Sequence, residues 1–181
     1  MKLLKYVLIY SAATLAAIVL MGITISFWCY HRFCDLDSRL YSPSAESVVR
    51  LTIDRSFDPP LSFTVIHTKT DTTLEACALP NAGSNFFTFS YVTCSLGDKE
   101  WKKIVDLIEK AEIPMIAHGK HGMYLDGSVW HISIARSGAV EKASIPNPDS
   151  RQDDVRYTSL FELGKMLNEN ADFITATERL Y

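Results

Sequence analysis

An uncharged run of 23 residues, from Tyr6 to Trp28, is the feature that most constrains this chain. A helix of that length rises about 35 Å at roughly 1.5 Å per residue, and the hydrocarbon core of a bilayer is about 30 Å thick. The serine and threonine hydroxyls in the run can each return a hydrogen bond to the preceding helical turn. The sequence therefore predicts a transmembrane helix over residues 6–28.

A cleaved secretory signal peptide is the alternative interpretation of this run. Such a peptide has an apolar part of about 7 to 15 residues that ends in a small-x-small cleavage site. Here the apolar run continues well past the small residues 11–13, and the bulky segment 27–29 is a poor cleavage site. The segment 24–26 is only a marginal one. The pattern favours an uncleaved signal anchor in contact with the lipid bilayer.

Positive charges near the run indicate its orientation, because lysine and arginine are retained on the cytoplasmic side. Lys2, Lys5 and the terminal amine precede the run, whereas Arg32 and Arg39 follow it. We therefore expect residues 1–5 in the cytoplasm and the bulk of the chain outside it. The sequence has no Asn-x-Ser/Thr acceptor, which favours a bacterial inner membrane and a periplasmic domain over a eukaryotic lumen or exterior.

The part of the chain after the run divides into a tether and a domain. Residues 29–46 are polar and irregular, and residues 47–181 have a length that suits one small domain with a single core. When Lys2 and Lys5 are excluded, 16 of the 18 basic residues remain. Against 21 acidic residues, they give the part of the chain after the run a net charge of −5. This balance argues against nucleic acid as a partner, because such partners require a basic surface.

Alternating apolar and polar residues predict six strands within this domain. The expected strands are 48–53, 61–68, 72–79, 86–94, 128–136 and 139–145. The fourth strand places Phe87, Phe89 and Tyr91 on one face, and Ser137–Gly138 forms the turn between the last two strands.

Two stretches instead have the spacing of amphipathic helices. The first covers residues 98–112, and the second begins at a capping box formed by Ser159 and Glu162. Strands interrupted by two separate helices predict an α+β domain, in which an antiparallel sheet of about six strands has helices covering one face.

Four cysteines, at positions 29, 34, 77 and 94, raise the question of a disulfide. In an oxidising compartment a Cys77–Cys94 bridge would stabilise the fold by about 3 kcal/mol. However, a hairpin centred near Ala82 places Cys77 opposite Thr88, so the bridge requires a different pairing or a bulge. Two buried thiols are the alternative.

Residues His118, His121 and His131 are the nearest approach to a metal site. Gly119 and Gly122 make the first part a loop, and no further ligand completes a set of four, so solvated loop histidines are the favoured interpretation. The sequence also lacks a Gly-x-Ser-x-Gly motif and a glycine-rich phosphate loop. It predicts no catalytic residue, cofactor or bound metal.

Three hypotheses about function follow. The first is a single-pass membrane protein whose outer domain binds another protein or an envelope component without catalysis. The second is a membrane-tethered metal-dependent hydrolase that uses His118, His121 and His131. The third is a small-ligand sensor with a pocket between the sheet and the helix that carries Trp101; the aromatic residues there are more typical of a core.

Overall fold

The computed structural model describes residues 10–25, 44–55, 60–78, 90–117, 127–146, 148 and 153–172. The chain separates into two units, Met1–Leu36 and Asp37–Tyr181. In the first unit the described part is a helix over residues 10–25, inside the predicted span 6–28. The ends of that span and residues 29–43 of the predicted tether lie outside the described residues. Within the described ranges, no helix combines the length and the apolarity that a membrane crossing requires.

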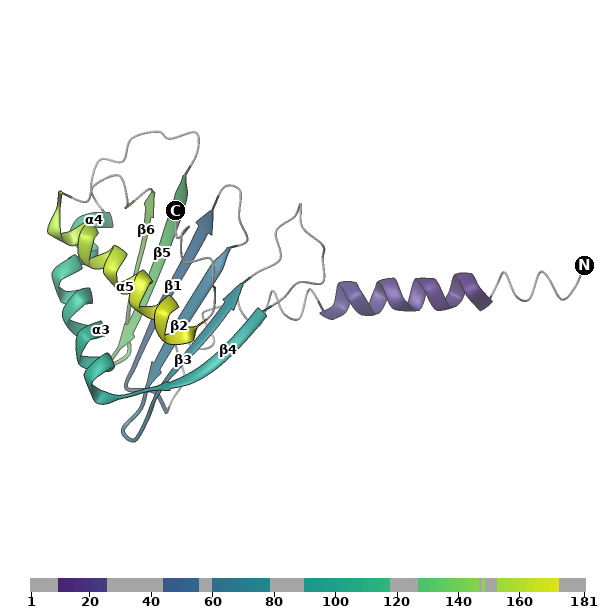
Figure 1. The fold of residues 1–181 in the computed structure, drawn as a ribbon, viewed down its shortest axis with the longest axis horizontal. Coiled ribbons are helices and arrows are strands. Elements are labelled where there is room, and N and C mark those ends of the chain that lie inside the picture. The colour runs from purple at the N-terminus through teal and green to yellow at the C-terminus, as the bar shows by residue number, and fades with distance from the viewer. Residues whose placement is uncertain are drawn as a thin grey trace, which may run out of the picture. The chain divides into compact units, whose positions relative to one another are not determined.

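The second unit is built on one antiparallel sheet of six strands in the order β4-β3-β2-β1-β5-β6 (Figure 1). The strands are β1 Ser47–Arg55, β2 Leu61–His67, β3 Thr72–Ala78, β4 Ser90–Leu96, β5 Ser128–Arg136 and β6 Ala139–Pro146. The predicted α+β class and six-stranded antiparallel sheet are therefore confirmed. Strand β1, the first in the chain, lies in the middle of the sheet, between β2 and β5.

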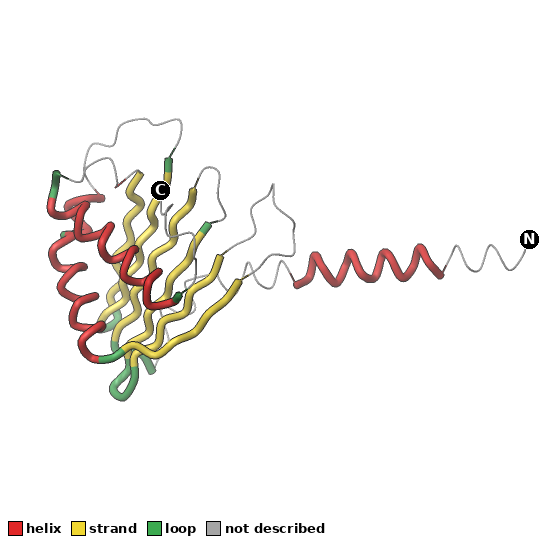
Figure 2. Tube along the Cα trace, viewed as in Figure 1, coloured by secondary structure: helices red, strands yellow, loops and turns green. Residues whose placement is uncertain are grey.

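Three helices accompany the sheet among the described residues, where the sequence predicted two: α3 Asp98–Ala111, α4 Ile113–Ala117 and α5 Val155–Ala171 (Figure 2). The helix α3 ends where Glu112 takes a left-handed conformation, with φ 44°. The short helix α4 follows at once, with Pro114 in its first turn. A proline is compatible with that position, because the first backbone N–H groups of a helix have no partner within the helix. No helix was expected from the sequence at the position of α4.

The predicted start of the last helix was wrong. The helix α5 begins at Val155, and Ser159 lies buried inside it. Asp154 is the N-cap, and its Oδ1 accepts a hydrogen bond of 3.0 Å from the backbone N–H of Arg156. Aspartate is among the best N-cap residues, so this earlier cap begins the helix four residues before the capping box.

The predicted fourth strand also differs from β4. Residues 86–89 lie outside the described residues, and β4 itself covers Ser90–Leu96. Cys77 lies opposite Tyr91 in the register, not opposite Thr88. The hairpin is therefore centred two residues beyond Ala82, and Tyr91 is 40% exposed on the sheet face opposite the helices.

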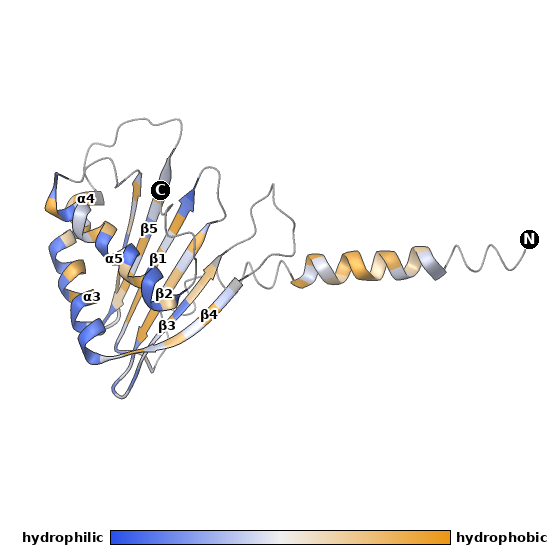
Figure 3. Cartoon of the chain, viewed as in Figure 1, coloured by the Kyte–Doolittle hydropathy of each residue, from blue (hydrophilic) through white to orange (hydrophobic). Residues whose placement is uncertain are grey.

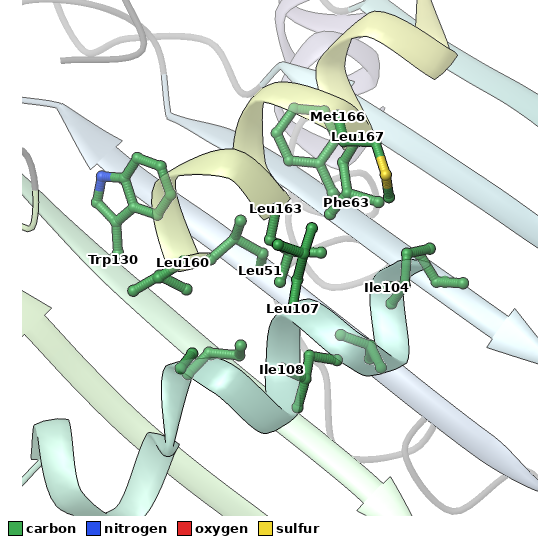
Figure 4. Packing of buried hydrophobic residues seen from close by; sticks show 14 of the residues in the cluster. Leu51, Phe63, Ile104, Leu107, Ile108, Trp130, Leu160, Leu163, Met166 and Leu167 are labelled. Atoms are coloured by element: carbon green, nitrogen blue, oxygen red, sulfur yellow. The ribbon is translucent and has the colours of Figure 1, made fainter. Parts of the chain in front are cut away.

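The hydrophobic core lies between the sheet and the helices. Figure 4 shows Leu51 and Phe63 from the sheet packed with side chains from α3 and α5. Trp130 of β5 is fully buried, donates from Nε1 to Ser128 Oγ at 3.0 Å, and stacks on Phe161 with 6.0 Å between ring centroids. This core covers one face of the sheet and leaves the other face as the candidate site.

Candidate binding face

All three described helices of the domain lie on one face of the sheet, as Figure 1 shows. We call the opposite face the helix-free face. Successive side chains of a strand alternate between faces, and the strand registers align them into rows. One row is apolar at its centre (Ile66, Val48, Ala135, Val140), the next carries charges (Glu75, Arg50, Lys142), and the third carries hydroxyls and an imidazole (Ser62, Thr52, His131, Ser144).

The centre and the edges of the helix-free face differ in exposure. At the centre, Val48, Arg50, Ser62, Thr64 and Cys77 are buried. The accessible side chains lie on β4 at one edge (Tyr91, Thr93 and Ser95) and, toward the other edge, on β6, on β5 and at the end of β1 (Lys142, Ser144, Val129 and Asp54). A partner that binds this face would therefore contact its two edges.

A chain of hydrogen bonds crosses three strands at one of these edges. His131 of β5 lies opposite Ser144 of β6 and diagonally across from Asp54 of β1, which is two residues from its register partner Thr52. Its Nε2 is 3.2 Å from Asp54 Oδ2, and its Nδ1 is 2.8 Å from Ser144 Oγ. Hydrogen bonds thus link the three side chains across adjacent strands.

These three residue types can activate a serine nucleophile in hydrolases. In such enzymes the aspartate is buried and holds the imidazole in one orientation, and backbone N–H groups stabilise the oxyanion. Here the side chains of His131 and Asp54 are 44% and 53% exposed, so water competes with their hydrogen bond. The geometry is that of a cross-strand surface network, which suits binding better than nucleophilic catalysis.

The predicted histidine metal site falls mainly outside the described residues, which include His131 but neither His118 nor His121. Both ring nitrogens of His131 are already engaged by Ser144 and Asp54. The described part of the chain contains no group of three or more histidine, cysteine or carboxylate residues placed to hold a metal ion. The metal-dependent hydrolase stays a prediction.

The two cysteines of the predicted disulfide are thiols in the structure. Cys77 lies on the helix-free face opposite Tyr91, whereas Cys94 lies opposite Leu74, which belongs to the core. The two cysteines therefore point to opposite faces of the sheet, and this register does not allow a bond between them. Burial raises the pKa of the Cys94 thiol, which keeps it protonated and less reactive.

The predicted sensor pocket lies between the sheet and α3. Ile104, Leu107 and Ile108 of α3 fill most of this space as part of the core (Figure 4). At the start of α3, Trp101 stacks on His67 of β2, with 4.3 Å between ring centroids. The aromatic side chain of Trp101 therefore packs against the core, as the sequence favoured.

No protein-family model matches this sequence, and no curated protein matches it. Sequence reasoning did not predict the His131 network, although the Ser137–Gly138 turn implies that His131 and Ser144 face each other. No local signal in the sequence indicates Asp54, which joins the network through the pairing of β1 with β5.

Proposed function

We propose that this chain is a single-pass membrane protein whose α+β domain lies outside the cytoplasm and binds another protein or an envelope component without catalysis. The helix-free face, with accessible polar and charged side chains at both edges, is the observation that carries this proposal. The described helices lie on the other face, and the accessible side chains of this face are those at its two edges.

The helix over residues 10–25 supports the membrane anchor. Its large apolar side chains are exposed, among them Leu15 at 64% and Ile18 at 59%. Figure 3 shows its predominantly hydrophobic colour. Thr14 and Thr24 each donate a hydrogen bond of 2.8 Å to the carbonyl four residues earlier, as the sequence predicted for such hydroxyls. A helix with so much exposed apolar surface is typical of one that lipid surrounds.

Two arginines in this helix are expected to remove the chain from the membrane. Arginine near the centre of a spanning helix opposes insertion by about 2.5–3.5 kcal/mol, so Leu15→Arg combined with Ile18→Arg adds a cost of roughly 5–7 kcal/mol. The measurement is the fraction of the chain that remains in the membrane pellet after an alkaline carbonate wash. Leu15→Ala with Ile18→Ala is the matched control and should stay in the pellet. A natural chain that washes off would contradict the anchor.

Site-specific photo-crosslinking is expected to identify the helix-free face as the partner-binding surface. A photoreactive residue at Thr93 or Ser144, on the two accessible edges, should give an adduct of one defined mass in cells. The same residue at Lys103 or Glu109, which are exposed on α3, should give none. Adducts from α3 alone, or none from any position, would contradict the proposed surface.

A charge reversal on the same face provides a second readout. Lys142 is exposed on β6, and Lys142→Glu should weaken the crosslink from Ser144 without unfolding the domain, because exposed substitutions usually change stability by less than about 0.5 kcal/mol. The matched control is Lys103→Glu on α3, which should leave the crosslink unchanged. Equal effects of the two reversals would indicate a general dependence on charge and not a contact at this face.

A further inference from the structure

Two buried polar atoms that have no hydrogen-bond partner among the described residues belong to directly paired positions on the helix-covered face of the sheet. They are Ser47 Oγ on β1 and Arg136 Nη2 on β5. Ser47 and Arg136 are directly opposite each other in the register, and Ser47 is only 6% exposed. Directly opposed side chains have Cβ atoms about 4.5–5.5 Å apart, so one small group can reach both.

The neighbouring strand adds an imidazole to this pair. His67 of β2 lies opposite Ser47 on its other side. Its Nδ1 is 2.8 Å from Thr72 Oγ1, and its ring stacks on Trp101 with an interplanar angle of 13°. These contacts fix the orientation of the imidazole ring. They therefore also fix the position of Nε2, which lies on the opposite side of the ring from Nδ1. Arg136, Ser47 and His67 thus form a row across three strands, which we call the polar corner.

The chemistry of the polar corner specifies its ligand. A buried guanidinium N–H and a buried hydroxyl that lack partners are costly, and native structures normally satisfy such groups with protein atoms, an ordered water molecule or a bound ion. Within the described part of the chain, no carboxylate pairs with Arg136. The guanidinium, hydroxyl and imidazole can all donate hydrogen bonds, so the group that fits them is rich in acceptors and carries negative charge.

We propose that the polar corner binds the oxyanion of a small ligand, a carboxylate or a phosphoryl group, through Arg136, Ser47 and His67. Arg136 is only partly buried, so the ligand reaches Ser47 from the side of the sheet where Arg136 meets solvent. This site is on the opposite face of the sheet from the proposed partner-binding surface. The failure of either proposal would therefore not affect the other.

Thermal unfolding of the full-length protein in detergent, with rising sodium acetate or sodium phosphate, tests the proposal. Sodium chloride at equal ionic strength controls for screening. A ligand that binds only the folded state raises the melting temperature in a saturable way. We expect a saturable rise with at least one oxyanion and none with chloride. The anion with the lower half-saturation concentration identifies the ligand group as carboxylate or phosphoryl.

Variants connect the response to the polar corner. Arg136→Gln should weaken oxyanion binding by about tenfold or more, because it removes the charged donor. Lys69→Gln removes one positive charge from the exposed β2–β3 turn at the same end of the sheet and should leave the response unchanged. If Arg136→Gln does not fold, Arg136→Lys keeps the charge, removes the forked geometry and should also weaken binding.

The Ser47→Ala variant tests whether the Ser47 hydroxyl takes part in oxyanion binding. Without added oxyanion this variant should be as stable as the natural chain or more so, because it removes an unpartnered buried hydroxyl. It should also respond more weakly to the oxyanion. The proposal is overturned by no saturable response in the natural chain, which is the result expected of water alone, or by an undiminished response in the Arg136 variant that folds.

Discussion

Replacement of Trp130 with alanine is expected to lower the free energy of unfolding by about 3–5 kcal/mol, the usual cost of removing a buried tryptophan. Trp130 is fully buried on β5, where its ring contacts both Phe161 and the α5 backbone near Gly164. The loss is a large part of the roughly 5–15 kcal/mol that stabilises a typical domain. The measurement is urea or thermal unfolding followed by circular dichroism, with a drop in melting temperature of roughly 10 °C or more.

Val129→Ala is the matched control for this prediction. Val129 is next to Trp130 in the chain but points to the helix-free face and is 36% exposed. We expect its replacement to cost less than about 1 kcal/mol, because little buried surface is lost. Similar losses for the two variants would mean that Trp130 does not join the sheet to α5.

The sheet was predictable where its strands are neighbours in the sequence. The Ser137–Gly138 turn sets the β5–β6 register, and Ser137 has φ 50° while Gly138 has φ 83°, as a tight hairpin turn requires. That register alone places His131 opposite Ser144. Half of the surface network therefore follows from local turn chemistry.

The rest of the network depends on a pairing that is distant in the sequence. The strands β1 and β5 are more than 70 residues apart, and their register brings Asp54 within 3.2 Å of His131. The same pairing places Arg136 opposite Ser47 in the polar corner. Alternation within a strand shows which residues share a face, but it does not show which strand becomes the neighbour. Neither the complete His131 network nor the polar corner could therefore be predicted from the sequence.

The start of α5 could not be predicted from the sequence for a different reason. Asp154 and Ser159 are both good N-cap residues, and the sequence analysis selected Ser159 because Glu162 completes a capping box. The structure begins α5 at Val155, which places Tyr157 in the core. The earlier cap is favoured because it buries an additional aromatic ring. The capping-box motif reflects only local hydrogen bonds and does not account for this burial energy.

Replacement of Gly164 with alanine is expected to destabilise the domain by about 1–3 kcal/mol. Alanine in place of an exposed helix glycine normally adds up to about 1 kcal/mol of stability. In α5, however, a Cβ on Gly164 would lie 2.7 Å from both Cη2 and Cζ3 of Trp130. The bond to Ser128 and the stacking on Phe161 hold the indole, so steric overlap outweighs helix propensity. Chemical unfolding of the full chain measures the sign of the change.

A compensating change in Trp130 can test this cause directly. Phenylalanine at position 130 lacks the far edge of the indole, so Trp130→Phe alone should destabilise the domain by leaving a cavity. In that background Gly164→Ala should become neutral or stabilising, because its Cβ enters the vacated space. The double-mutant cycle should then show a coupling of about 1–3 kcal/mol, as expected for side chains in contact. Additive effects would show that Gly164 is needed for another reason and that the approach of α5 to β5 is not set by the indole.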